Sequence, residues 1–187
     1  MWPFKKKNHD IPTKRTLHRY ILNIPTKRTL HHYILAHVAL KRVCFDDPFG
    51  FFALMASPHR QKFLDDLWTQ ICQNCNQEGE AHFSPRDIKI ETTRVGEYPA
   101  IVVEMPTPRF IAEAHMICVV LKVPVNELQQ ETEKAEVRYF TLEKGINFKT
   151  GGDRTVLCAW DGESHINYGD GPVATPAAFI DAVKKLL

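Results

Sequence analysis

The stretch Asp87-Ile-Lys-Ile-Glu-Thr-Thr-Arg-Val-Gly-Glu-Tyr-Pro-Ala-Ile-Val-Val-Glu-Met105 decides the fold of this chain. Two strand-like runs flank the dipeptide Gly96-Glu97, and glycine at the first central position is typical of a two-residue type II′ hairpin turn. Such a turn fixes the register, and the pairs that follow from it are Val95 with Tyr98, Ile90 with Val103, and Lys89 with Glu104. One face of the hairpin is then apolar and the other carries an opposite-charge pair, as expected of a hairpin that packs on a core.

Further segments extend the predicted sheet. Residues 114–123 are almost entirely apolar, which predicts a central strand covered on both faces. Residues 144–154 are glycine-rich and predict a loop. The remaining predicted strands are Val137–Glu143, Thr155–Trp160 and His165–Tyr168. The last two form a second hairpin in which Trp160 pairs with His165.

Helices are predicted before and after these strands. Ser57-Pro58 is typical of an N-cap and an N1 proline, and apolar residues recur at helical spacing from Phe63 to Cys75. Thr175-Pro176 begins a last helix, whose inward side chains are predicted to be Phe179, Val183 and Leu186. The order predicts an α+β fold with N-terminal helices, a mainly antiparallel sheet of about five to six strands and one C-terminal helix.

The aromatic segment Phe49–Phe52 follows a turn and has two interpretations. If it is exposed, it is a candidate contact surface, because contiguous exposed apolar side chains mark interaction sites. If it is buried, it packs over the sheet, and packing is the interpretation that we favour.

Charge is distributed unevenly along the chain. Residues 1–45 carry ten lysines and arginines and one acidic side chain, whereas the remainder is acidic on balance. This basic part contains a tandem repeat, since residues 11–22 recur at 24–35 with a 13-residue period and one difference. We predict a basic, partly disordered N-terminal arm over residues 1–25, which holds the first copy, and a single α+β domain over residues 26–187.

Composition also bears on location. No apolar run reaches the roughly 18–20 residues of a membrane-spanning helix, and no apolar segment follows the basic start as in a secretory signal. The five cysteines are an odd number without the spacing of a disulfide framework. We therefore expect a cytoplasmic protein with reduced thiols and no membrane span.

Cys72-Gln-Asn-Cys75 is the first candidate site, because a C-x-x-C pair begins many zinc and redox sites. His82 is the nearest further ligand in sequence, and His115 with Cys118 forms an H-x-x-C pair. The two helix cysteines nevertheless fall on the apolar stripe, where cysteine acts as a small hydrophobe. We expect core cysteines here, with no metal and no cofactor.

The second predicted hairpin is the better candidate. Its register places Cys158, Trp160, His165 and Asn167 on one face, with Tyr168 and Asp170 beside them. A cysteine, a histidine and a polar orienting group are what a thiol nucleophile uses, so Cys158, His165 and Asp170 are catalytic candidates and Trp160, Asn167 and Tyr168 binding candidates. The competing interpretation is ordinary turn chemistry with a partly buried histidine.

The sequence contains no phosphate-binding loop, no nucleophile elbow and no H-E-x-x-H motif. We therefore favour a non-enzymatic module that binds another protein or self-associates, as an oligomer or adaptor. One alternative is a small hydrolase or ligand-binding protein that uses the face of Cys158, Trp160 and His165. A second is nucleic-acid binding through the basic arm, which its aromatic and basic residues suggest without a recognised motif.

Overall fold

The computed structural model describes residues 41–42, 44–74, 88–105, 111–122, 136–161 and 164–187. The chain forms two compact units, Met1–Asp87 and Ile88–Leu187. The predicted arm at residues 1–25 and both copies of the repeat lie outside the described residues, so the domain organisation and the nucleic-acid alternative stay predictions. No helix in the described part of the chain is long and apolar enough to cross a membrane.

The first unit contains two described helices, α3 (Pro48–Met55) and α4 (Arg60–Asn74). Asp47 caps α3, because its carboxylate accepts the backbone N–H of Gly50 at 2.9 Å. The rings of Phe51 and Phe52 are buried and meet edge to face at 6.1 Å. The aromatic segment is therefore a packed helix and not an exposed surface.

The start of α4 differs from the sequence prediction by two residues. Ser57 does act as an acceptor, but its hydroxyl takes the N–H of His59 at 3.2 Å, and the helix begins at Arg60 instead of Pro58. Phe63 and Leu64, the first residues of the predicted apolar stripe, are buried.

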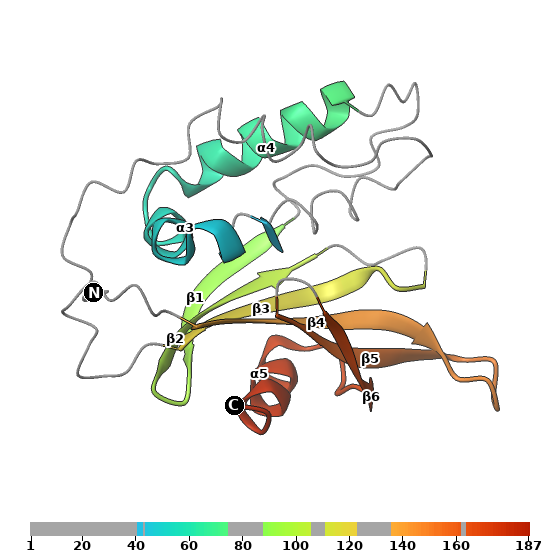
Figure 1. The fold of residues 1–187 in the computed structure, drawn as a ribbon. Helices are drawn as coiled ribbons and strands as arrows, with labels where there is room; N and C mark the ends of the chain where they lie inside the picture. The colour runs from blue at the N-terminus through green and yellow to red at the C-terminus, as the bar shows by residue number, and fades with distance from the viewer. Residues whose placement is uncertain (1–40, 43, 75–87, 106–110, 123–135, 162–163) are drawn as a thin grey trace. The chain divides into compact units, whose positions relative to one another are not determined.

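Among its described residues, the second unit contains a six-stranded antiparallel sheet in which sequential strands are neighbours, so β1 and β6 are the two edges of this sheet (Figure 1). This confirms the predicted α+β class. The strands are β1 (Lys89–Val95), β2 (Tyr98–Glu104), β3 (Ala114–Lys122), β4 (Glu136–Ile146), β5 (Asp153–Trp160) and β6 (His165–Asp170).

The first hairpin has the predicted register from Lys89–Glu104 to Val95–Tyr98. Gly96 has φ +62°, and Glu97 does not share a positive φ, which is the sign pattern of a type II′ turn. The Lys89 ammonium lies 3.6 Å from the Glu104 carboxylate. The turn dipeptide therefore determines both the pairing and the faces.

The loop between β4 and β5 is shorter than predicted. Gly145 lies within β4 and pairs with Arg154, so the strands continue to Ile146 and from Asp153. Asn147 makes the turn instead, since its carbonyl accepts the Gly151 N–H at 2.7 Å and its N–H reaches the Gly152 carbonyl at 2.8 Å.

Helix α5 (Pro176–Lys184) lies against one face of the sheet (Figure 1). Thr175 caps it as predicted, accepting the Ala178 N–H at 3.3 Å, and Pro176 occupies the first turn. The core on this face consists of Val95, Ala100, Val102, Met116, Cys118, Val120, Phe140, Leu142, Leu157, Ala159, Phe179 and Val183. The prediction that Leu186 faces inward is wrong, because the helix ends at Lys184 and Leu186 is exposed beyond it.

Candidate functional site

The second hairpin brings the predicted site residues onto one face. Trp160 pairs with His165 and Cys158 with Asn167, as the sequence predicts. The register shifts between Cys158 and Val156, so that Val156 pairs with Asp170. The extra residue that this shift places on β6 is accommodated at Gly169, whose φ is +86°. Cys158 and His165 are therefore diagonal neighbours on the face opposite α5.

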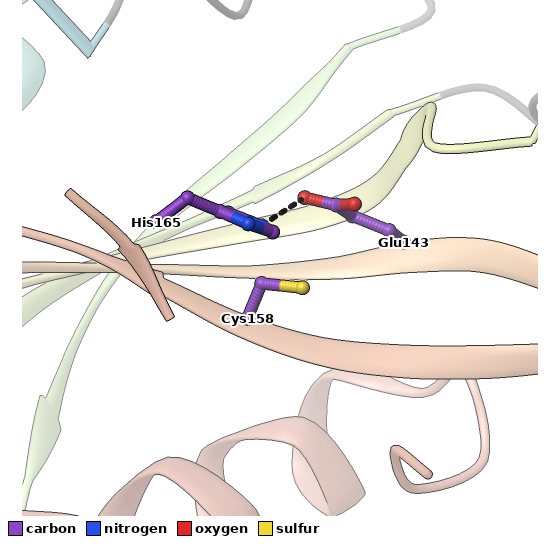
Figure 2. Close-up of side chains that lie close together, drawn as sticks. All are labelled: Glu143, Cys158 and His165. Carbon is purple, nitrogen blue, oxygen red and sulfur yellow. Dashed lines mark ion pairs between the residues drawn. The ribbon is translucent and has the colours of Figure 1, made fainter. Parts of the chain in front are cut away.

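Glu143 of β4 completes a three-residue cluster with Cys158 of β5 and His165 of β6. Their carboxylate, thiol and imidazole atoms all lie within 4.8 Å of one another. Figure 2 shows the three side chains pointing toward a common point above the sheet. The His165 Nε2 atom is 3.8 Å from Glu143 Oε1, an ion pair when the imidazole is protonated.

Strand register explains why these three side chains converge. Cys158 is paired directly with Thr141 on one side and with Asn167 on the other. Glu143 lies two residues after Thr141 on β4, and His165 lies two residues before Asn167 on β6. Because β4 and β6 run in the same direction, these two residues lie on opposite sides of Cys158 along the strands. Long side chains span such diagonal positions, so the carboxylate and the imidazole meet over the short cysteine between them.

Two further contacts hold the cluster in place. The Thr141 hydroxyl donates to Glu143 Oε1 at 2.7 Å, and this hydrogen bond is buried. The imidazole of His165 packs against the indole of Trp160, with ring centroids 4.5 Å apart and ring planes inclined by 48°. The carboxylate is thus the fixed end of the cluster, and the partly exposed imidazole is its adjustable end.

The Cys158 thiol is protonated at neutral pH. Burial raises its pKa to about 12, and the neighbouring Glu143 carboxylate adds to the increase because it repels a thiolate and accepts a hydrogen bond from the thiol. A hydrogen bond with Thr141 opposes this shift only in part. A thiolate is the nucleophilic form of cysteine, so this arrangement does not favour the thiol chemistry that the hydrolase alternative needs.

Asp170, the third catalytic candidate, belongs to a different feature. Its carboxylate pairs with Arg154 at 2.6 Å and lines a cleft of about 470 Å³ at the end of the sheet. His115 and Lys144 also line this cleft, whereas Cys158, Trp160 and His165 do not. The structure therefore brings together Cys158 and His165 but not Asp170.

The predicted binding residues also separate. Trp160 contacts the cluster through His165. Asn167 uses its side-chain oxygen to accept the Gly169 N–H at 2.7 Å, which supports the bulge. Tyr168 belongs to the exposed strand β6 and is not part of the cluster.

The earlier metal candidates are not brought together in the described part of the chain. Cys72 lies in the last turn of α4, whereas Cys75 and His82 fall outside the described residues. Cys118 belongs to the core under α5, where burial raises its pKa to about 12. His115 lies three positions earlier, where a register shift interrupts β3, and lines the cleft.

Sequence reasoning missed Glu143. The sequence puts Glu143 at the end of a predicted strand, two residues after Thr141, so alternation alone places both side chains on one face of that strand. The missing information was that β4 neighbours β5. Comparison with known proteins adds nothing to these assignments, because no family model, curated protein or solved structure matches the chain.

Proposed function

We propose that this chain is a protein-binding module that self-associates by pairing β6, an edge strand of the described sheet, with β6 of a second copy. The observation that carries the proposal is the exposure of this edge strand. Ile166 is 42% exposed and Tyr168 is 45% exposed, although both are large and apolar or aromatic. An edge strand presents unpaired backbone groups to any strand that approaches it.

The two edges of the sheet differ in how they are protected. On β1, the exposed residues include Lys89, Glu91 and Arg94, and charges of this kind discourage edge-to-edge pairing. Strand β6 contains no lysine, arginine or glutamate, and its one aspartate, Asp170, is neutralised by Arg154. The contrast supports β6 as the edge that accepts another strand.

The sequence of β6 favours a second copy as its partner. If two β6 strands pair antiparallel about a two-fold axis at Asn167, each Ile166 lies opposite Tyr168 of the partner subunit. Aromatic and β-branched side chains form favourable cross-strand pairs. The two-fold arrangement makes this pair twice, which is the self-complementarity that an isologous interface requires.

The bulge limits how far such pairing extends. The register shift and the positive φ of Gly169 end the regular edge after Tyr168. With the two-fold axis at Asn167, the residues that pair are therefore Ile166, Asn167 and Tyr168. A short edge favours reversible dimers over open-ended aggregation.

Analytical ultracentrifugation over a range of protein concentrations tests this proposal. We expect a concentration-dependent dimer, and we expect Ile166→Lys to weaken it by roughly 10- to 30-fold, because two cross-strand pairs worth up to about 1 kcal/mol each are lost and each copy carries an unpaired charge in their place.

The matched control is Phe148→Lys, which removes a more exposed aromatic side chain, 93% exposed, from the β4–β5 loop. This variant should dimerise like the parent chain. A parent chain that stays monomeric at high concentration would refute the proposal, as would a dimer that Ile166→Lys leaves unchanged.

A further inference from the structure

We infer that Glu143, Cys158 and His165 form a zinc site with three protein ligands and one open coordination position. The inference concerns the face opposite Ile166 and Tyr168, so it does not rest on self-association. It also differs from the metal interpretation of the C-x-x-C motif, because none of its ligands comes from Cys72, Cys75 or His82.

The donor set is the first support. The cluster offers one sulfur, one imidazole nitrogen and one carboxylate oxygen, each from a different strand. Zinc takes these three donor types in tetrahedral geometry, and sites with three protein ligands keep the fourth position for water or another ligand. Magnesium and calcium prefer all-oxygen sites, so sulfur and imidazole favour zinc over them.

The spacing is the second support. Zinc–ligand bonds of about 2.0–2.3 Å at tetrahedral angles put neighbouring ligand atoms roughly 3.4–3.6 Å apart. The three ligand atoms lie within 4.8 Å of one another, and His165 Nε2 and Glu143 Oε1 are already at 3.8 Å. The ligand atoms therefore need to approach one another by about 1 Å to bind the ion. We assign most of this movement to His165, because its side chain is 37% exposed at the sheet edge.

The surrounding contacts are the third support. Ligands of zinc are usually oriented by a second layer of hydrogen bonds and packing. Here Thr141 donates to Glu143 Oε1 from the same strand, and Trp160 packs against the imidazole of His165. A carboxylate has further lone pairs, so Glu143 can bind an ion while it keeps the hydrogen bond from Thr141.

Binding converts the thiol to a thiolate. The sulfur–hydrogen bond of Cys158 breaks, a sulfur–zinc bond forms, and the proton leaves to solvent; no electron is transferred. Glu143 and His165 each donate a lone pair and lose no proton when the imidazole is neutral. The hydrogen bond from the thiol to Glu143 is replaced by their shared coordination of the ion.

Cobalt titration of the full chain tests the site directly. A thiolate bound to Co²⁺ gives a sulfur-to-metal charge-transfer band in the near ultraviolet, and zinc added afterwards removes the band by displacing the cobalt. We expect this band in the parent chain. We expect His165→Ala to weaken zinc binding by more than about 100-fold, beyond what the loss of an outer-shell partner costs.

Three further variants separate the proposed site from other ligands. Cys158→Ser should abolish the band, which confirms the sulfur donor independently of His165. His115→Ala removes a histidine of the same sheet that lies outside the cluster and should bind like the parent chain. Cys72→Ser leaves all three proposed ligands in place and should also bind like the parent.

The opposite outcomes overturn the inference. A parent chain without the band has no thiolate site for this ion. A band that forms in His165→Ala at the same cobalt concentration as in the parent chain, or that disappears in Cys72→Ser, places the metal elsewhere in the chain. The dimerisation measurement is separate, so its failure and the failure of the zinc site are distinguishable.

Discussion

The substitution Phe179→Ala tests how the sheet is held to its C-terminal helix. Phe179 is 0% exposed, and with Val183 it makes up the fully buried part of α5. A buried phenylalanine removes about 150–250 Å² from water, worth roughly 4–6 kcal/mol at 25 cal/mol per Å² as an upper bound. Alanine keeps part of that area, and measured substitutions of this kind cost about 3–5 kcal/mol. We expect the free energy of unfolding to fall by about 4 kcal/mol.

Urea denaturation followed by far-ultraviolet circular dichroism gives the measurement. With a slope of about 2 kcal/mol per molar urea, the expected loss lowers the midpoint by about 2 M. The matched control is Phe148→Ala, the same chemical change at a side chain that is 93% exposed. Exposed substitutions of this kind usually change stability by about 0.5 kcal/mol or less.

The comparison of the two phenylalanines makes this prediction refutable. If both variants lose the same stability, or if Phe179→Ala costs less than about 1 kcal/mol, α5 does not pack on the sheet as described. A change in the denaturation slope would instead indicate an altered unfolded or native ensemble, and the midpoint shift would then not measure packing.

Three further predictions follow from single groups. Gly96→Ala should lower the free energy of unfolding by about 1 kcal/mol, because the φ angle of Gly96 is +62°. Gly152 has no positive φ, and an added Cβ there would make only ordinary contacts. Gly152→Ala should therefore cost less in the same denaturation assay. Burial, and then the charge of Lys144, lower the pKa of His115 below its usual 6.5. The unfolded chain therefore binds this proton at a higher pH than the folded chain does, and the free energy of unfolding should fall as the pH drops below 6.5. His115→Gln should flatten this pH dependence, and an unchanged slope in that variant would contradict the prediction. The Cys118 thiol, whose pKa is raised to about 12 by burial, should resist thiol reagents at neutral pH until the chain is unfolded, and fast labelling detected by mass spectrometry would show that it is accessible.

The hairpins were predictable because their information is local. Two residues at a turn set the register of everything that flanks them, so Gly96-Glu97 determines the pairing of β1 with β2. In the same way, the pairing of Trp160 with His165 gave the shared face of Cys158 and Asn167. The cap of α5 at Thr175 is equally local.

The cluster was only half predictable because it depends on a pairing between separate segments. Sequence alternation assigns Glu143 to a face of β4, but nothing local states that β4 lies beside β5. The bulge at Gly169 is a second example, since it shifts the register so that Asp170 pairs with Val156 and its carboxylate meets Arg154. A register that is read from the turn alone cannot show where the pairing slips farther along the strand.

The pleat of β6 separates the two proposals physically, although both use the same strand. Successive side chains point to opposite faces, so Ile166 and Tyr168 lie on the α5 side, where Ile166 is paired with the core residue Ala159. His165 lies on the other side with Glu143. A substitution at Ile166 removes no metal donor, and a substitution at His165 removes no apolar edge contact. A single change that abolished both dimerisation and cobalt binding would therefore indicate that β6 no longer pairs with β5, not that one activity controls the other.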